Sequence, residues 1–446
     1  MRINLPNPKL FSKLVSDVTG NKLDSPVLGV TTDSRDFKQG DFYIALEGER
    51  TDGHNYLPEL ESLGCTAALV SKRNDSLTSL KQVVVGNTVT TIGEIANLWQ
   101  NQFHIPTIAI TGTNGKTTTK DLLTHIFSAS MNVHSTEKNF NTSIGLPLTL
   151  LMQTTAHSIS ILEMGANQPG DISYLCKITE PTCGLITNIA PAHLEGFGTV
   201  EEITKEKGEL FQFLLDGYSF VNQADSKIKE LPVPGNKITF GLTPDCDFPA
   251  DIYEEKDGTL TLLINTEEVQ TQSYNLSFAK NILAAAAISL TMKIDMETFQ
   301  ERILSFDPPK GRCEVKHFGD ITVIDDTYNA NLESTIASID YLNAFSKNGR
   351  RILVFGDMFE LGNQSQRIHQ EVGEKCSDAN LDGVFTVGPL SIHTDTQLKN
   401  IELHKHFDSK DDLTSQLKRI IKNGDKILFK GSRGMSMETI IQGVFG

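Results

Sequence analysis

Short runs of apolar residues alternate with amphipathic segments along most of the chain. Within residues 1–83, DFYIALEG and AALVSK are typical of strands, and LPELESLG is typical of a short helix that ends at a glycine. Between residues 84 and 306, helical segments separate the strand-like runs TIAIT, ISILEM, GLITNI and YSFVN. This alternation predicts a mostly parallel sheet covered by helices.

The alternation starts again after FDPPKGR, a break marked by prolines. ITVIDD, RILVFG, GVFTVG and KILFKG are strand-like and predict a second doubly wound domain. A chain of 446 residues is long enough for two or three domains. We therefore predict an α/β protein with a small N-terminal α/β domain (1–83), a central mostly parallel α/β domain (84–306) and a C-terminal Rossmann-like α/β domain (307–446).

Composition and charge exclude several classes of partner. The formal net charge is -16, with 40 Lys and Arg against 56 Asp and Glu, so the surface repels nucleic acid and anionic lipid. Six cysteines are scattered without a CxxC pair, which argues against structural zinc and a disulfide framework. Neither a signal peptide nor a membrane span is apparent. We expect a cytoplasmic protein, and a monomer.

A glycine-bracketed turn follows the strand-like TIAIT and precedes KTTTKDLLTHIFSA, which has one apolar helical face. In this turn, Gly112-Thr113-Asn114-Gly115-Lys116-Thr117, backbone N–H groups can converge on an anion. Lys116 would neutralise phosphate oxygens and Thr117 would hold Mg2+. Ile110 stands where the eight-residue motif has glycine, so the loop is a shorter variant. It predicts a P-loop-containing ATPase domain; a plain glycine turn is the alternative.

Two other strand-like runs end beside residues that can bind a metal. Glu163 ends ISILE, and His193 follows GLITNI by a few residues. Ligands of open α/β sheets bind at the carboxyl ends of the strands, so both side chains could share a divalent cation with the phosphates. An ordinary strand-end acid and a loop histidine bonded to backbone are the alternatives.

A lysine lies on the apolar face of the helix predicted over TVEEITKEKGELFQFLL. Thr199 and Glu202 are spaced as a capping box. Lys207 lies on the inward face, whereas Lys205 points elsewhere. A buried lysine is costly unless it snorkels, pairs or is chemically altered, and the three possibilities stay open. The apolar positions of this face are Val200, Ile203, Leu210, Phe211 and Leu214.

Together these features resemble the Mur ligases, the ATP-dependent amide-forming enzymes of peptidoglycan precursor synthesis. TTDSRDFKQGDFYIALEGERTDGHNYL (31–57) is similar to the family's uridine-nucleotide recognition segment. Further motifs look like those of the member that adds D-alanyl-D-alanine to UDP-N-acetylmuramoyl-tripeptide. These are NFNTSIGLPLTLL (139–151), NIAPAHLEGFG (188–198), IDDTYNANLEST (324–335), FGDMFELG (355–362) and KGSRGMSME (430–438). The chain departs from the family pattern at Thr142 and Leu332.

The resemblance implies an ATP-dependent ligase that forms a C–N bond through an acyl phosphate. It implies ATP and two Mg2+ ions as cofactors and a carbamylated Lys207. It assigns catalysis to Lys116, Glu163, His193 and Lys207, and metal binding to Thr117, Glu163, His193 and Lys207. It assigns the nucleotide to Gly112, Thr113, Asn114, Gly115, Lys116, Thr117, Thr118, Asn281, Arg312 and Asp326. It assigns the substrates UDP-N-acetylmuramoyl-tripeptide and D-Ala-D-Ala to Asp33, Ser34, Arg35, Asn139, Asn141, Tyr328, Asn329 and Asn331.

Several alternatives remain open. Asn281 could cap its alanine-rich helix, Arg312 could form a surface ion pair, and Asp326 could be a strand-end acid. Asp33 and Ser34 could simply make a turn. For the whole chain, the alternatives are a sibling ligase (third-amino-acid-adding or folylpolyglutamate synthase-like), a nucleotide-dependent switch, and a simple kinase. The third residue of the tripeptide is left open between lysine and diaminopimelate.

Overall fold

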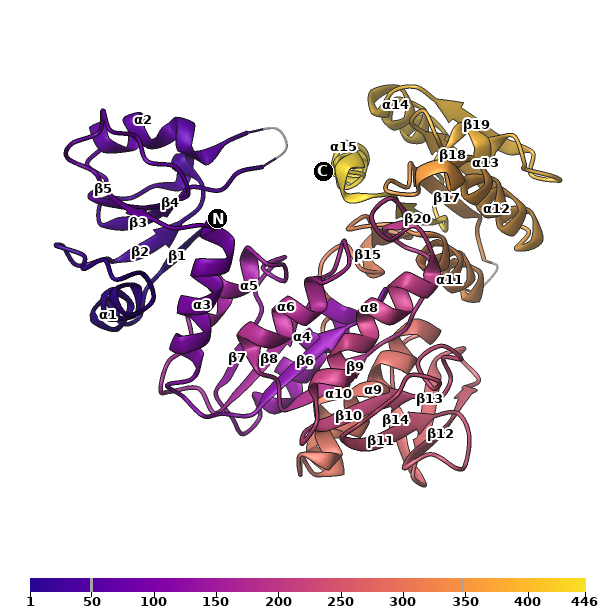
Figure 1. The fold of residues 1–446 in the computed structure, drawn as a ribbon. Coiled ribbons are helices and arrows are strands. Elements are labelled where there is room, and N and C mark those ends of the chain that lie inside the picture. The colour runs from indigo at the N-terminus through magenta and orange to yellow at the C-terminus, as the bar shows by residue number, and fades with distance from the viewer. Residues whose placement is uncertain (49–50, 346–347) are drawn as a thin grey trace.

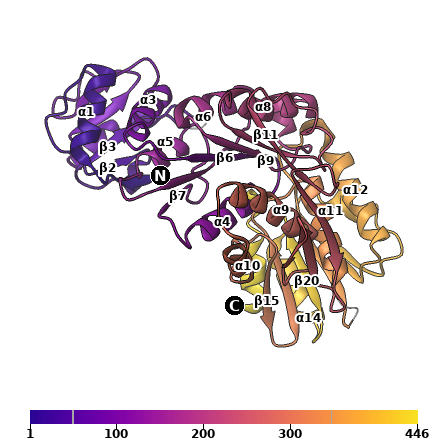
Figure 2. The same ribbon diagram turned by 90° about the horizontal axis from the view of Figure 1, so that it is seen from below.

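The computed structural model describes residues 1–48, 51–345 and 348–446. The chain forms three sheets, of five, nine and six strands, each with helices on it. Figures 1 and 2 show the N-terminal sheet (indigo) and the C-terminal sheet (orange to yellow) on either side of the central one. The predicted three-domain α/β class is confirmed.

The N-terminal sheet has the strand order β1-β2-β3-β4-β5, with β1 antiparallel and the rest parallel. Its core contains an edge-to-face pair of Phe11 and Phe42, whose ring centroids lie 5.6 Å apart. The elements are β1 (Arg2–Asn4), α1 (Pro8–Thr19), β2 (Gly29–Thr31), β3 (Asp41–Ile44), α2 (Leu57–Ser62), β4 (Ala67–Val70) and β5 (Lys81–Val84), with short 3-10 turns at Ser34–Asp36 and Gly53–Tyr56.

Helix α3 (Thr88–Gln100) joins the first two domains. It packs against α1 on one side and against α5 (Gly145–Leu150) and α6 (Asp171–Thr179) on the other. Its fully buried Trp99 donates from Nε1 to the carbonyl oxygen of Gln153, at 3.0 Å. Because α3 shares a core with both domains, the boundary expected at residues 83 and 84 stays a prediction, as does the one at 306 and 307.

The central sheet has the order β14-β13-β12-β11-β10-β9-β6-β8-β7 and is parallel from β7 to β12. Strands β12, β13 and β14 form an antiparallel extension that the hydrophobic pattern did not predict. The strands are β6 (Thr107–Thr111), β7 (Val133–Ser135), β8 (Ile159–Glu163), β9 (Cys183–Ile186), β10 (Tyr218–Asn222), β11 (Asn236–Gly241), β12 (Phe248–Glu254), β13 (Leu260–Ile264) and β14 (Glu267–Gln270).

Helices cover both faces of this sheet. Ile108 and Ile110 of β6 pack into one core and Ala109 into the other, as the two-residue period of a strand requires. The buried alanines of α9 leave room for α4 to pack closely against it. On the isoleucine side lie α4 (Lys116–Phe127), α9 (Leu276–Thr291) and α10 (Met296–Leu304); on the other lie α5, α6 and α8 (Val200–Phe213), with the short α7 (Leu194–Phe197) beside α8.

The C-terminal sheet has the order β15-β16-β20-β17-β18-β19, with only β15 antiparallel. Within the described residues, no helix of the protein is long and apolar enough to span a membrane. The elements are β15 (Glu314–Phe318), β16 (Ile321–Asp326), α11 (Leu332–Ala344), β17 (Arg351–Gly356), α12 (Ser365–Asp378), β18 (Gly383–Val387), α13 (Ile392–Asp395), β19 (Leu403–Phe407), α14 (Lys410–Ile420), β20 (Lys426–Lys430) and α15 (Glu438–Phe445), with 3-10 turns at Gly362–Gln364 and Arg433–Met435.

Helix α8 starts where the sequence predicts, but its capping box is only half formed. The Thr199 side chain accepts from the N–H of Glu202 at 3.2 Å, while the Thr199 N–H donates to the carbonyl of Phe197. Further along the helix, Glu206 is buried and was not singled out from the sequence. Its carboxylate accepts from the N–H groups of Gly170 (2.7 Å) and Ile172 (2.6 Å). It thereby satisfies donors that the start of α6 would otherwise leave open.

Removing this carboxylate leaves those buried N–H groups unpaired. We expect Glu206→Ala to lower the free energy of unfolding by about 2–3 kcal/mol. Urea unfolding followed by the fluorescence of Trp99, the single tryptophan, measures the change. Lys205→Ala is the control, because Lys205 is exposed on the same helix and its loss should cost less than about 0.5 kcal/mol. Equal stability of the two variants would contradict the capping role.

Candidate functional site

The predicted phosphate loop is held by the chain that follows the neighbouring strand β9. The N–H of Thr113 donates to the backbone carbonyl of Asn188 at 2.9 Å, and the N–H of Asn114 donates to the Asn188 side chain at 2.7 Å. Gly112 has φ 142°, and a Cβ there would overlap the Thr187 hydroxyl. The loop therefore requires glycine at 112 and depends on Asn188. This asparagine begins the NIAPAHLEGFG motif, but its role in the site is visible only in the fold.

The other end of the loop is open to an anion. Within the described residues, the N–H groups of Gly115, Lys116, Thr117 and Thr118 have no hydrogen-bond acceptor. They lie at the start of α4, where the helix dipole adds partial positive charge. Four converging donors at a helix N-terminus form a site for phosphate oxygens.

Asn281 lies against this loop. It is in the interior of α9, whose N-cap is Asn275, so the alternative that Asn281 caps the helix is wrong. Gly115 has φ 81°, and a Cβ there would lie 2.6 Å from Oδ1 of Asn281. Gly170 is also a helix N-cap with left-handed backbone angles, but a Cβ on Gly170 would meet no atom within 4 Å. The left-handed backbone favours glycine at position 115, and the short distance shows that the Asn281 side chain lies directly against the loop.

Two lysine amines converge on one carbonyl of the loop. Nζ of Lys116 lies 2.8 Å, and Nζ of Lys207 3.0 Å, from the carbonyl oxygen of Gly112. Lys207 is 4% exposed, and in the described chain it forms no ion pair. Burial, and secondly the charge of Lys116, lower the pKa of Lys207 to about 7. Burial also lowers the pKa of Lys116. Lys207 thus neither snorkels to solvent nor pairs with an acid.

Glu163, at the end of β8, offers a carboxylate oxygen to a cation. Its Oε1 accepts from the amide of Asn141 at 2.7 Å. Its Oε2 is buried and, among the residues described, has no hydrogen-bond donor. A buried, unpartnered carboxylate oxygen beside a phosphate loop fits a divalent cation that prefers oxygen ligands.

His193 is bound by an acid from the C-terminal domain. Its Nδ1 lies 2.5 Å from Oε2 of Glu360, and this contact lowers the pKa of Glu360. The alternative of a histidine bonded to backbone is therefore wrong. The contact leaves Nε2 of His193 for another ligand, an arrangement in which the acid orients the imidazole. Glu360 belongs to the quoted FGDMFELG motif but was not assigned to the site.

The C-terminal domain also contacts the phosphate loop directly. Arg312 donates from Nη2 to the Thr117 hydroxyl at 2.9 Å, and its Cζ lies 4.2 Å from the centroid of the Tyr328 ring. Arg312 is therefore not a surface ion pair. The amide of Asn331 donates to Oδ1 of Asn114 at 2.7 Å. Residues of the two domains thus share one set of polar contacts around the loop.

Asp326 ends β16 and is engaged within its own domain. It is paired with the buried Nζ of Lys430 and accepts from the Ser338 hydroxyl at 2.6 Å. The N–H of Cys313 donates to its other oxygen at 3.2 Å. Asp326 therefore stabilises its own domain through these contacts. Its contact to a ribose stays a prediction. Lys430 is in the quoted KGSRGMSME motif, but only the fold reveals its partner.

A cleft of about 1580 Å³ between the central and C-terminal domains collects nearly all the expected residues. The expected residues that line it are Gly112, Thr113, Asn114, Gly115, Lys116, Thr117, Thr118, Asn139, Asn141, Glu163, His193, Lys207, Asn281, Arg312, Asp326, Tyr328, Asn329 and Asn331.

Asp33, Ser34 and Arg35 lie apart from this cleft, in the N-terminal domain. The Asp33 carboxylate accepts from the backbone N–H of Arg35 at 3.0 Å and pairs with its guanidinium at 2.6 Å. These contacts, mainly the side-chain hydrogen bond, lower the pKa of Asp33 to about 2. The three residues do make the local turn that the alternative reading expected, and their contact to a uridine nucleotide stays a prediction.

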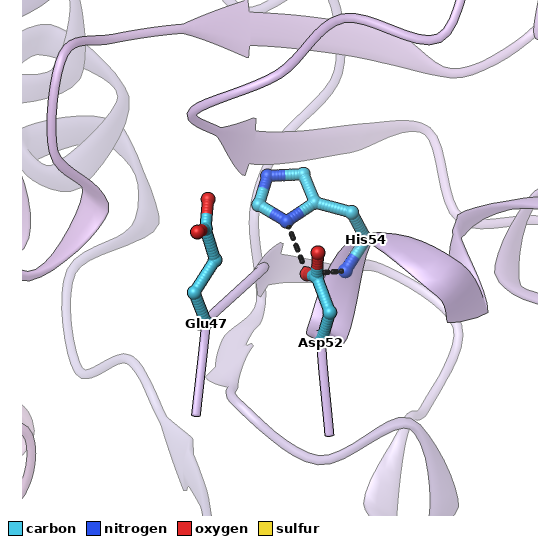
Figure 3. A group of neighbouring side chains, drawn as sticks. All are labelled: Glu47, Asp52 and His54. Atoms are coloured by element: carbon cyan, nitrogen blue, oxygen red, sulfur yellow. Dashed lines mark hydrogen bonds and ion pairs between the residues drawn. The ribbon is translucent and has the colours of Figure 1, made fainter. Parts of the chain in front are cut away.

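Glu47, Asp52 and His54 form a second polar cluster in the N-terminal domain (Figure 3). Nδ1 of His54 lies 2.6 Å from Asp52, and its Nε2 accepts from the N–H of Ser71 at 3.0 Å. Lys72 lies 3.1 Å from Glu47 and 4.0 Å from Asp52. Both imidazole nitrogens are occupied and a lysine supplies the countercharge, so we assign no ion to this cluster.

Comparison with known proteins covers all three domains. Residues 26–102 match a domain described as Mur ligase family, catalytic domain; residues 110–289 match the Mur ligase middle domain; residues 311–433 match the Mur ligase, glutamate ligase domain. The chain is 33% identical to UDP-N-acetylmuramoyl-tripeptide--D-alanyl-D-alanine ligase of Haemophilus influenzae, over 98% of both chains. It is 32% identical to the Escherichia coli protein of the same name, over 96% of each.

Solved structures of proteins named MurF are also similar to this chain. MurF from Acinetobacter baumannii superposes with a TM-score of 0.90 and 28% identity, covering 99% of this chain and 100% of that one. MurF ligase from Thermotoga maritima, solved in complex with ADP, gives a TM-score of 0.81 and 29% identity, covering 93% of this chain and 96% of that one. The likeness therefore extends over the whole arrangement of three domains.

The buried amine of Lys207 makes stability depend on pH. Its pKa of about 7 in the folded protein lies below the ordinary 10.5, so the unfolded chain binds more protons between these values and stability rises with pH. We expect Lys207→Met to be more stable than the native chain below pH 7, by on the order of 2 kcal/mol, with the gain fading toward pH 10.5.

Urea unfolding at several pH values in CO2-free buffer measures this difference. Lys205→Met on the exposed side of the same helix is the control and should show no such pH dependence. A difference between Lys207→Met and the native chain that stays constant with pH would contradict the depressed pKa.

Proposed function

Because the chain belongs to the Mur ligase family, we propose that it is an ATP-dependent ligase that joins D-alanyl-D-alanine to UDP-N-acetylmuramoyl-tripeptide. The product is the UDP-linked pentapeptide precursor of peptidoglycan. The observation that carries this proposal is the single cleft in which the phosphate loop, Glu163 and Lys207 of the central domain meet Arg312 of the C-terminal domain. A ligase of this kind must bring nucleotide, acid and amine together, and a cleft shared by two domains can do so.

The reaction needs an activated acid, because an amine does not displace oxygen from a carboxylate unaided. In the proposed sequence, the terminal carboxylate of the tripeptide attacks the γ-phosphorus of ATP, ADP leaves, and an acyl phosphate forms. The amine of D-Ala-D-Ala attacks the acyl carbon and loses a proton, and phosphate leaves the tetrahedral intermediate. The open N–H groups from Gly115 to Thr118, with Lys116 and Arg312, would bind and neutralise phosphate oxygens.

Two Mg2+ ions fit the donors around the loop. Oε2 of Glu163 is buried without a donor among the described residues. Thr117 and His193 line the same cleft, and the contact of His193 with Glu360 uses Nδ1, which leaves Nε2 for a metal. When bound, Mg2+ would neutralise charge on the transferred phosphoryl group. Glu360, which contacts Nδ1, would hold the imidazole of His193 so that Nε2 can bind the metal.

Lys207 is proposed to be carbamylated and to serve as an anionic metal ligand. Its amine is buried, unpaired in the described chain and only weakly basic, so a neutral fraction can attack CO2 near neutral pH. The ammonium group first loses one proton to the solvent. The neutral amine then forms an N–C bond with CO2 and releases a second proton, so that a buried cation has become an anion. Lys116 and a metal would attract this anion, whereas they would repel a second ammonium group.

The other assignments follow the family. Asn139, Asn141, Tyr328, Asn329 and Asn331 would hold the peptide substrates, and Asp33, Ser34 and Arg35 the uridine diphosphate. Asn281 would contact adenine and Asp326 the ribose. We infer a monomer that works in the cytoplasm, where ATP is available. Six free cysteines, as the described chain has them, agree with a reducing compartment.

The proposed function predicts strict dependence of phosphate release on both peptide substrates. With ATP and Mg2+, orthophosphate should appear only when UDP-N-acetylmuramoyl-tripeptide and D-Ala-D-Ala are both present, in equal amount to the pentapeptide product. A phosphate assay combined with mass spectrometry of the product measures this. ATP turnover that ignores either substrate would support a kinase or a switch instead, and turnover with a single free amino acid would support a sibling ligase.

The carbamate predicts a specific loss and rescue. We expect Lys207→Ala to lower kcat by at least about 100-fold and acetate to restore part of it, because a small carboxylate can occupy the place of the carbamate. Independently, 13C NMR after equilibration with 13C-bicarbonate should show a carbamate carbon that Lys207→Ala lacks and Lys205→Ala keeps. Full activity of Lys207→Ala, or identical 13C spectra, would contradict the modification.

A further inference from the structure

The proposed substrate D-Ala-D-Ala has a carboxylate as well as its reacting amine, and an anion that enters a cleft needs a cation to receive it. Lysines and arginines from both domains line the cleft. Lys116 and Lys207 hold the Gly112 carbonyl, and Arg312 holds Thr117. Lys430 is buried against Asp326. These four groups are engaged around the phosphate loop or within the domain core.

Three cations of the described cleft lining remain: Lys280, Lys310 and Arg433. Lys280 also borders a smaller depression with Asp251 and Glu254, on the side of the β12–β14 extension. Lys310 is exposed and carries a compact charge without the paired donors that suit a carboxylate. Arg433 offers a planar fork that can bind both oxygens of a carboxylate at once.

The backbone that carries Arg433 is well fixed. Ser432, immediately before it, is buried; its N–H donates to the carbonyl of Asp357 at 2.9 Å, and its hydroxyl accepts from the N–H of Phe359 at 2.9 Å. The guanidinium of Arg433 is exposed at the cleft and uses Nη1 to contact Glu438 at 2.9 Å. A guanidinium has five N–H donors, so one such contact leaves the fork free for a ligand.

Arg433 lies near Arg312, the arginine that contacts the phosphate loop. Cζ of Arg433 lies 5.9 Å from the centroid of the Tyr328 ring, and Cζ of Arg312 lies 4.2 Å from the same centroid. The two guanidinium groups are therefore separated by no more than the sum of these distances, and Arg312 touches Thr117. An extended dipeptide spans about 7 Å, so its amine can lie near Arg312 while its carboxylate reaches Arg433.

We propose that Arg433 binds the C-terminal carboxylate of D-Ala-D-Ala, with the Tyr328 ring lying between the two ends of the dipeptide. This inference rests on the proposed function and adds a residue that selects the incoming substrate. It explains why an arginine that makes one ion pair at the surface of its own domain also faces the ligand cleft. It predicts that the enzyme distinguishes a dipeptide acid from its uncharged amide.

Steady-state kinetics with D-Ala-D-Ala and with D-alanyl-D-alaninamide test the proposal. In the native enzyme the amide should be the poorer substrate. Arg433→Gln should raise KM for D-Ala-D-Ala about 10- to 100-fold, leave KM for ATP within about twofold, and use acid and amide almost equally. Arg433→Lys should recover only part of the preference, because lysine lacks the fork.

Two variants serve as matched controls. Arg367→Gln removes an arginine of similar exposure, 65% against 61%, that pairs with Glu371 in the same domain, outside the cleft lining. Lys310→Gln removes the other exposed cation of the C-terminal side. Both should keep the native preference for the acid.

The proposal fails if Arg433→Gln keeps that preference, if KM for ATP rises in parallel, or if Lys310→Gln abolishes the preference instead. If Arg433→Gln shows no turnover, the affinity for D-Ala-D-Ala is measured instead, by titration calorimetry of each enzyme in the presence of a non-hydrolysable ATP analogue. An affinity unchanged by the substitution would contradict the proposal. A native enzyme without ligase activity would instead contradict the proposed function, so the two failures are distinct.

Discussion

The attachment of the phosphate loop to the end of strand β9 is the contact on which the site depends. Thr113 and Asn114 donate their N–H groups to Asn188, and Gly112 passes so close to Thr187 that no side chain fits. Strands β9, β6 and β8 are adjacent and parallel, so their carboxyl ends lie at one edge of the sheet. This order brings Glu163 and the loop after β9 to the start of α4, where donors for an anion are open.

This arrangement concentrates positive charge in a chain whose net charge is -16. Two amines share the Gly112 carbonyl, and one of them is almost completely buried. Such a group weakens the empty protein, because burial and the neighbouring cation both disfavour its charge. Anionic ligands relieve the same repulsion. The site therefore lowers the stability of the protein without ligand and favours the protein with anionic ligands bound. Such a trade-off between stability and function is common at functional sites.

The two junctions between domains differ in chemistry. At the first, α3 buries Trp99 and shares an apolar core with both neighbours. At the second, polar contacts surround the phosphate loop: Arg312 with Thr117, Asn331 with Asn114, and Glu360 with His193. Apolar packing is present there too, because the rings of Tyr274 and Phe345 lie 5.2 Å apart. Each polar contact around the loop is worth only about 0.5–1.5 kcal/mol, so these contacts can be exchanged for contacts with a ligand. An arrangement of this kind suits a cleft that admits substrates and then excludes water.

The amino-acid sequence by itself determined the elements whose signals are local. Consecutive apolar residues predicted β6, β8 and β9 and, in the last domain, β16, β17, β18 and β20. The glycine turn predicted the phosphate loop, and helical periodicity put Lys207 on the inward face of α8. The short strand β7 and the polar strands β15 and β19 were not predicted, because their patterning is weak. Only the tertiary structure decided that Asn188 holds the loop, that Glu360 binds His193, and that Lys430 pairs with Asp326. The members of each pair are separated by tens to more than a hundred residues, and a contact across that distance exists only once the sheets have formed.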